Sequence, residues 1–290
     1  MKKIILTCFL VPQFAFSQLP SEKFGQDNVL EIATWNIEWF GNTQKGPSDE
    51  DLQLRKIKEN LEFLNFDIIG LQEIVNQAHF EELVSQSGME GIRSKPSSNR
   101  QEISIMWNPN SVELLENKQI LVSDKHSFAQ RPPHMFKFRD KTGAIGSDFF
   151  VIVLHMKAHI PSSSFSDKED SYNRRKKAAG LLADFIDSNL SDDKVMVIGD
   201  WNDDVDTSNF KPRETPFKSL IASPNYEFAT AHLSWGGSAS SKFGSVIDHI
   251  LISNELFDEQ YQTGIVTLST YDKDYIKKAS DHFPAYIMFK

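Results

Sequence analysis

Short apolar runs, separated by stretches with helical spacing, form the basic pattern of this chain. The runs are short and rich in isoleucine, valine and leucine, which is typical of buried β-strands. Strands are predicted at residues 31–37, 67–71, 103–107, 149–154, 195–198, 246–252 and 284–289. Residues 234–245, which are rich in glycine and serine, are expected to form a mobile surface loop. No internal repeat of fixed period interrupts this order.

Three stretches carry apolar residues at the spacing of an α-helix. Ser48 and Asp51 form a candidate capping box in front of the first. Its buried face would carry Leu54, Ile57, Leu61 and Leu64. The second helix covers residues 77–87 and is expected to end at Gly88. The third is expected to begin near Ser171. Strands therefore alternate with helices early in the chain, and the last third is richer in strands.

The first residues are typical of a signal peptide rather than of the fold. Lys2 and Lys3 precede an apolar stretch too short to span a bilayer, and Ser17 completes a small-x-small cleavage site. We therefore expect a signal peptide over residues 1–17, an N-terminal extension over 18–28 and one catalytic domain over 29–290. The chain would be exported to the periplasm or the extracellular space. A lipoprotein using Cys8 is less favoured, because too little hydrophobic segment precedes it.

Composition narrows the chemistry of the mature chain. The 290 residues contain one cysteine, Cys8, which lies inside the expected signal peptide. Disulfides, thiolate zinc sites and a cysteine nucleophile are thereby excluded. The formal charge is −9, and removal of Lys2 and Lys3 would make it −11. Such a protein has no broad basic surface for nucleic acid, although metal ions and a few arginines can still bind a phosphodiester. No later run is long enough for membrane insertion.

Oxygen-bearing side chains stand at or beside the ends of predicted strands. Carboxylate and amide oxygens are the ligands that Mg²⁺ prefers in proteins. The candidate metal ligands are Asn36, Glu73, Asp200, Asn202 and Asp281. Each alone is also compatible with an ordinary turn. Together with two nearby histidines, His155 and His282, they predict the site of a divalent-metal phosphodiesterase.

Two other metal sites are excluded by spacing. A calcium loop starting at Asp200 would place Val205 where glycine is needed and Lys211 where glutamate is needed. His155 and His159 are four residues apart, as in helical zinc proteases, but no glutamate lies between them. A site for a divalent ion such as Mg²⁺, built from carboxylate and amide oxygens, therefore remains the best interpretation of these residues.

The order of these fragments resembles the endonuclease/exonuclease/phosphatase superfamily, typified by deoxyribonuclease I, and in particular its secreted bacterial members. The fragments are Trp35-Asn36, residues 67–73, Gly199-Asp200-Trp201-Asn202, Ile247-Asp248-His249 and Ser280-Asp281-His282-Phe283-Pro284. The resemblance spans residues 31–289. It implies an α/β fold, a four-layer α/β sandwich in which two mixed β-sheets pack face to face with helices outside. The ligands would gather at one edge of the paired sheets.

The resemblance also implies roles for single residues. Asn36 and Glu73 would hold the metal, with Asp200, Asn202 and Asp281 beside them. The implied catalytic residues are His155, Asp200, Asn202, Asp248 and His282. Asp248 would orient His282. Whether a histidine or Asp200 acts as the general base stays open.

Four further positions are implied with alternatives. Glu38 stands where some members carry an acid, so it would be a metal ligand or lie next to one. Glu102 would be a metal ligand, or lie next to one by pairing with His155, or be an exposed strand residue. Arg131 would contact the phosphate. Arg175 would do the same or lie on a solvated helix face.

The expected activity is that of a secreted phosphodiesterase dependent on Mg²⁺, with Mn²⁺ or Ca²⁺ as alternatives. The favoured substrate is DNA, hydrolysed with little sequence preference by a monomer. The same fold would also suit a sphingomyelinase-like phospholipid phosphodiesterase or a small phosphate-ester phosphatase. From another class, a catalytically inactive phosphate-binding module would be expected to lack one of the ligands.

Overall fold

The computed structural model describes residues 19–26, 29–96, 101–159, 163–210 and 213–290. The expected signal peptide and its cleavage site at Ser17 lie outside these residues. No helix in the described ranges is long and apolar enough to cross a membrane. The predictions of export and of a separate N-terminal extension therefore stay predictions.

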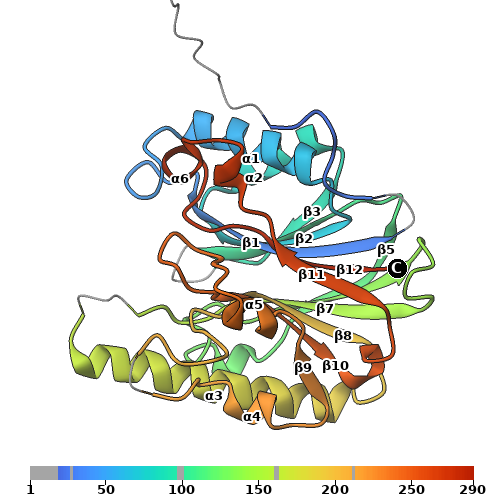
Figure 1. Ribbon diagram of the computed structural model, residues 1–290, viewed down its shortest axis with the longest axis vertical. Coiled ribbons are helices and arrows are strands. Elements are labelled where there is room, and N and C mark those ends of the chain that lie inside the picture. The colour runs from blue at the N-terminus through green and yellow to red at the C-terminus, as the bar shows by residue number, and fades with distance from the viewer. Residues whose placement is uncertain (1–18, 27–28, 97–100, 160–162, 211–212) are drawn as a thin grey trace, which may run out of the picture.

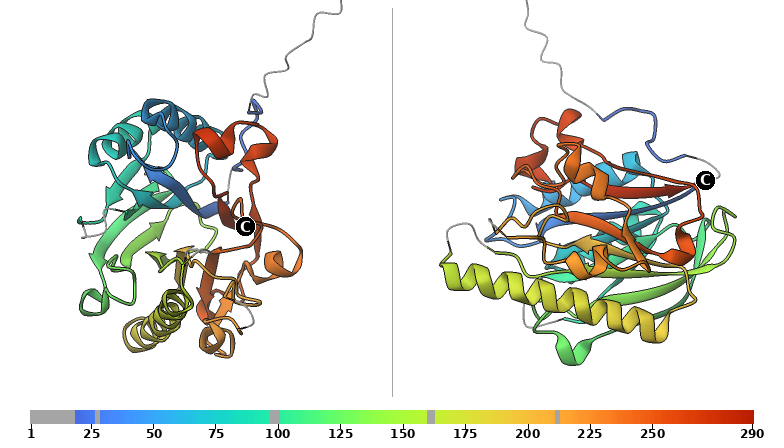
Figure 2. Two further views of the ribbon diagram at one scale, coloured as in Figure 1. Left: turned by 90° about the vertical axis from the view of Figure 1, so that its left-hand side faces the viewer. Right: turned by 60° about the horizontal axis from the view of Figure 1, so that its bottom comes forward.

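Within the described residues, two six-stranded sheets pack face to face (Figures 1 and 2). The first sheet has the order β11-β12-β1-β2-β4-β3. Its strands are β1 (Leu30–Phe40), β2 (Ile68–Ile74), β3 (Glu90–Arg93), β4 (Glu102–Trp107), β11 (Tyr261–Ile265) and β12 (Ala285–Phe289). The second has the order β5-β6-β7-β8-β10-β9. Its strands are β5 (Val112–Gln119), β6 (His134–Asp140), β7 (Asp148–His155), β8 (Val195–Asp200), β9 (Tyr226–Phe228) and β10 (Asp248–Ser253). Both are mixed, because β1 and β2, and likewise β7 and β8, run parallel.

Helices cover the outer faces of both sheets. In Figure 1, α1 (Glu50–Leu64) and α2 (Gln77–Ser87) lie above the first sheet. Below the second lie α3 (Phe165–Asn189) and α4 (Lys218–Ile221). Two short helices, α5 (Ala231–Trp235) and α6 (Tyr275–Lys278), stand in the loops before β10 and β12. Turns of 3₁₀-helix occur at Val122–Asp124, Asn254–Leu256 and Leu268–Thr270. The predicted four-layer α/β sandwich is confirmed.

Three buried clusters fill the spaces between these layers. Successive side chains of a strand point to opposite faces, so Ile68 joins the core between the sheets while Ile69 joins the core beneath α1 and α2. Leu182 of α3 belongs to a third cluster, which packs on the outer face of the second sheet. At Gly70 a Cβ would come within 2.8 Å of Ile198 in the opposite sheet. Because the central strands are covered on both sides, they are continuously apolar in sequence.

The predicted central strands and helices are confirmed, with changes at their ends. Helix α2 has the predicted bounds, and Gly88 follows it in the left-handed conformation. Helix α1 is capped by Asp49, whose carboxylate accepts from the Leu52 N–H at 2.8 Å, so the capping box starting at Ser48 is wrong. Helix α3 begins at Phe165 rather than near Ser171. Its first turns are polar and gave no apolar periodicity.

Candidate active site

Strand register in the second sheet brings three predicted site residues side by side. His155, at the end of β7, pairs with Asp200, at the end of the parallel strand β8. Asp200 in turn pairs with Asp248, the first residue of the antiparallel strand β10. Neighbouring strands lie about 5 Å apart, so residues paired in this way are close. The sheet therefore builds this part of the site from residues that are distant in sequence.

The first sheet contributes residues from β1 and β2. Asn36 donates an amide N–H to Asp200 at 3.0 Å and to Glu73 at 3.3 Å, and thereby joins the two sheets. Its amide oxygen accepts from the Glu38 N–H at 3.0 Å. Glu73 also accepts from the Trp39 N–H at 2.9 Å. In this conformation Asn36 orients carboxylates, and its amide would have to turn over before its oxygen could bind a metal.

Residues from both sheets line one open cavity of about 790 Å³. Its polar lining consists largely of the predicted site residues. They are Glu38, Glu73, His155, Asp200, Asn202, Asp281 and His282. Asn202 adopts a positive φ of 57° and donates its backbone N–H to Asp200 at 2.8 Å. The cavity gathers more carboxylates than cations, which suits binding of a metal ion.

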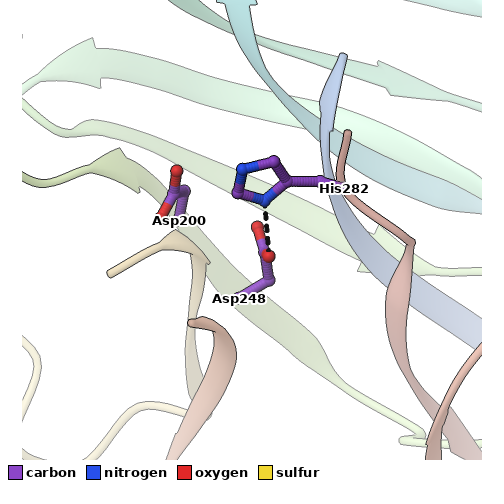
Figure 3. Close-up of side chains that lie close together, drawn as sticks. All are labelled: Asp200, Asp248 and His282. Carbon is purple, nitrogen blue, oxygen red and sulfur yellow. Dashed lines mark hydrogen bonds and ion pairs between the residues drawn. The ribbon is translucent and has the colours of Figure 1, made fainter. Parts of the chain in front are cut away.

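His282 is held by Asp248. Its Nδ1 lies 2.8 Å from the Asp248 carboxylate, and Figure 3 shows this carboxylate pointing at the His282 ring, whose far side faces Asp200. Burial alone would lower the pKa of His282, but the negative charge of Asp248 and its hydrogen bond, with further help from Asp200, raise that pKa well above its usual value. His282 is therefore positively charged at neutral pH.

His155 has the opposite electrostatic setting. It is 3% exposed, and burial together with the positive charges of Arg131 and His282 holds its pKa well below the usual value. Its Nε2 lies 3.5 Å from Asp200, and its Nδ1 has no hydrogen-bond partner among the described residues. A neutral and a charged histidine thus face the same cavity, which is the arrangement that acid–base catalysis requires.

Crowded carboxylates give the cavity its affinity for cations. Burial and the neighbouring Asp248 charge raise the pKa of Asp200 to about 7. Burial and the neighbouring Asp281 charge likewise raise the pKa of Glu38 to about 7. A divalent ion among these oxygens would relieve their mutual repulsion. The donor set, made of carboxylates and amides without sulfur, fits a hard cation such as Mg²⁺, Mn²⁺ or Ca²⁺.

Comparison with known proteins assigns the fold to a family. The sequence profile described as the Endonuclease/Exonuclease/phosphatase family matches residues 33–282. That range includes every predicted site residue. The chain belongs to the endonuclease/exonuclease/phosphatase family. Its members are metal-dependent phosphoesterases, and the protein is an enzyme of that class.

Solved structures of this family have the same fold at low sequence identity. Humanized D. rerio TDP2 has a TM-score of 0.67 and 14% identity, covering 91% of this chain and 100% of its own. The human Nocturnin catalytic domain with bound sulfate anion has a TM-score of 0.64 and 18% identity, and the match covers 91% of this chain and 95% of the Nocturnin chain. Mannosyl-6-phosphatase Bt3783 of Bacteroides thetaiotaomicron has a TM-score of 0.58 and 16% identity, and the match covers 89% of this chain and 98% of the phosphatase chain. No curated protein matches in sequence.

Neither predicted phosphate-binding arginine faces the cavity of this family member. Arg131 is 4% exposed and donates to the backbone oxygens of His155 at 3.3 Å and Met156 at 3.1 Å. Arg175 is fully buried, forms an ion pair with Asp203 at 2.8 Å and donates to the Lys157 oxygen at 2.6 Å. Both fix the backbone that follows His155. The structure therefore corrects both predicted phosphate contacts, and Arg175 is not on a solvated face either.

Glu102 differs from one of its alternatives. It is 1% exposed, so it is not an exposed strand residue. His155 Nδ1 has no hydrogen-bond partner in the described part of the chain, and the role of Glu102 beside the metal site stays a prediction. The predicted mobile surface loop before β10 is partly built into the core. Ser240 is fully buried, and its hydroxyl accepts from the Asp248 N–H at 3.0 Å.

Sequence reasoning missed the residues that position His282. The Ser280 hydroxyl accepts from the His282 backbone N–H at 3.0 Å and donates to the backbone oxygen of Asn36 at 2.6 Å. The Tyr275 hydroxyl donates to the His282 oxygen and accepts from the Trp35 indole at 2.9 Å. Ser280 directly precedes the Asp-His fragment and could have been noticed. Tyr275 gave no sequence signal, because only the fold brings α6 against β1.

Proposed function

We propose that this enzyme is an exported, divalent-metal-dependent phosphodiesterase that hydrolyses DNA with little sequence preference. The observation that carries the proposal is a pair of buried histidines at a carboxylate-lined cavity, with His282 Nδ1 2.8 Å from Asp248 and His155 Nε2 3.5 Å from Asp200. Their pKa values are shifted in opposite directions. Hydrolysis needs one group to take a proton from water and another to protonate the leaving oxygen. His155 and His282 provide these two states at the same place.

Each residue has a proposed role. His282, kept charged by Asp248, protonates the leaving oxygen. Neutral His155, or Asp200 beside it, removes the proton from the attacking water. Glu73, Asp200, Asn202 and Asp281 hold Mg²⁺, together with Glu38, and Asn36 joins them if its amide turns over. When bound, the ion stabilises the charge that develops on the phosphoryl oxygens.

The choice of DNA rests on weaker support than the chemistry. A D. rerio TDP2 structure with a single-strand DNA product has a TM-score of 0.66 and 14% identity to this chain, which supports the fold and suggests the substrate by analogy. Binding through phosphate groups alone carries no sequence information. The catalytically inactive alternative is disfavoured because four of the five candidate ligands line the cavity and the fifth, Asn36, hydrogen-bonds to Glu73 and Asp200.

A substrate panel tests the proposal. Plasmid DNA, denatured DNA, RNA, sphingomyelin, a sugar phosphate and bis-p-nitrophenyl phosphate would be incubated with Mg²⁺, Mn²⁺, Ca²⁺ or EDTA. DNA hydrolysis that EDTA abolishes and Mg²⁺ or Mn²⁺ restores is expected. Efficient cleavage of sphingomyelin or of the sugar phosphate, with both forms of DNA intact, would overturn the proposed substrate. Full activity in EDTA would overturn the metal site.

A further inference from the structure

Four aromatic side chains surround the polar part of the cavity. They are Trp39, Phe165, Phe210 and Phe243, called here the aromatic rim. They come from four separate segments of the chain. Phe165 is 65% exposed and Phe243 is 69% exposed. Large apolar side chains left in water beside a reaction centre usually mark a binding surface.

Phe243 is displayed by a turn that is fixed at both ends. The Gly244 N–H donates to the Ser241 oxygen at 3.1 Å, and Gly244 adopts a φ of 81°, which favours glycine. Ser241 forms a β-bridge with His282, and the Lys242 N–H donates to the Asp281 oxygen at 2.8 Å. The backbone that carries the exposed ring is therefore attached directly to the segment of Asp281 and His282.

Phe165 and Trp39 are also anchored. Phe165 is the first residue of α3, which Ser164 caps, and its ring lies 5.2 Å from that of Phe210. Trp39 lies in the irregular part of β1, between the positions Asn36 and Phe40 that pair with β2, and donates its backbone N–H to Glu73 at 2.9 Å. Anchored aromatic rings lose little conformational entropy when a ligand stacks on them, so they bind planar groups efficiently.

A positively charged side chain lies near each ring of the aromatic rim. Lys45 Nζ lies 4.3 Å from the Trp39 ring, and Lys242 Nζ lies 5.2 Å from that of Phe243. The Arg213 guanidinium lies 5.8 Å from Phe165 and also stacks over Phe210 at 4.7 Å. Lys242 also forms an ion pair with Asp281 at 3.0 Å, and Arg213 forms one with Glu169 at 2.7 Å. The rim thus combines planar apolar surfaces with groups that attract anions.

This combination distinguishes between the candidate substrates. A choline headgroup is a cation that binds uncovered aromatic faces, whereas each of these rings already has a cationic side chain near it. A nucleic-acid strand carries anions and planar bases in alternation, which matches cations interleaved with rings. In a duplex the faces of the bases are covered by their neighbours, so only unpaired bases can stack on the rim.

We propose that the aromatic rim binds unpaired nucleobases of a single-stranded nucleic acid on either side of the scissile phosphate. Phe165 and Phe243 are the stacking surfaces, and Lys45, Lys242 and Arg213 contact neighbouring phosphates. The proposal rests on the proposed nuclease function and narrows its substrate to unpaired strands. It explains why a nuclease cavity can lack the arginines expected at the phosphate.

The test compares strands with and without bases. Ligands are an oligothymidylate, a chain of equal length made of abasic tetrahydrofuran residues, and a duplex. Binding is measured by fluorescence anisotropy in EDTA, where turnover is stopped, and hydrolysis is measured in Mg²⁺. The variants are Phe165→Ala, Phe243→Ala and the double substitution. Trp235→Ala is the matched control, because Trp235 is 68% exposed and lines a different cavity.

Stacking is worth about 1–3 kcal/mol per base, or roughly 5- to 150-fold in affinity. Each rim substitution should raise Kd and KM for oligothymidylate by about that factor, with kcat little changed. Kd and KM for the abasic chain should not change, and the Trp235→Ala variant should bind and hydrolyse oligothymidylate as the wild type does. Equal losses on both single strands, or wild-type preference for duplex, would overturn the rim as a base-binding site. Base-dependent binding without hydrolysis would overturn only the nuclease function.

Discussion

At the scale of single residues, the environment decides what each histidine can do. His282 and His155 are both buried, yet their pKa values are shifted in opposite directions. The difference comes from their neighbours, because Asp248 supplies a negative charge to His282 while Arg131 places a positive charge near His155. A pair of titratable groups separated in this way divides the proton transfers between them.

Replacement of either histidine should affect the chemical step. His155→Ala and His282→Ala are each expected to lower kcat by ~10²-fold or more, with the folded structure retained, because each removes a proton-transfer group. His159→Ala is the control, since His159 lines the same cavity without contacting Asp200 or Asp248. Steady-state kinetics and circular dichroism measure both effects. A larger loss from His159→Ala would contradict the assignment.

The pH dependence should report the charge on His282. Its pKa is raised, so the charged form persists above neutral pH and activity falls as pH rises through that value. Asp248→Asn removes the negative charge that raises the pKa. The high-pH fall in kcat should therefore move to lower pH in this variant. Identical high-pH limbs in the two profiles would show that His282 is not the acid.

At the scale of elements, the site residues lie at strand ends, and a buried ion pair fixes the loops that follow two of these strands. Arg175 on α3 binds the loop after β7 through the Lys157 oxygen and the loop after β8 through Asp203. Asp203 also accepts from the Ser208 hydroxyl and the Asn209 N–H, at 2.9 Å and 2.6 Å. One guanidinium thus fixes two loops that border the cavity.

Loss of this ion pair should reduce stability. Arg175→Ala leaves the Asp203 charge buried without its partner, which typically costs about 3–5 kcal/mol. Lys177→Ala, an exposed change on the same helix, should stay within about 0.5 kcal/mol of wild type. Urea unfolding measures both. If Arg175→Ala left stability unchanged and raised KM, Arg175 would instead bind the substrate phosphate, as the sequence predicted.

At the scale of the whole molecule, metal binding should be coupled to folding. The carboxylates of Glu73, Asp200 and Asp281 come from both sheets and meet only in the folded chain. A ligand that binds only the folded state raises its stability, by about 2.7 kcal/mol at a hundredfold excess over Kd. Mg²⁺ should therefore raise Tm in a concentration-dependent way. Glu73→Gln should weaken this response, and an unresponsive wild type would contradict the site.

Much of this architecture was already determined by the sequence. Alternation of apolar runs with helical spacing predicted the central strands, because strands covered on both faces must be apolar throughout. The two-sheet sandwich was predicted from the resemblance of the ordered fragments to the family. Gly88 correctly ended α2. The cavity-lining acids, amides and histidines were found because each lies at or next to a strand end. The start of α3 was missed, since its first turns are polar and stabilised by a cap rather than by packing.

Tertiary structure alone decided how the residues act. The direction of a long side chain depends on its surroundings, so the sequence could not show that Arg131 and Arg175 bind backbone oxygens instead of phosphate. The opposite charges of His155 and His282 arise from contacts across strands and between distant segments. The aromatic rim likewise combines four segments that are separate in sequence. Local patterns determine elements, whereas pKa values and cavity surfaces depend on neighbours that only folding brings together.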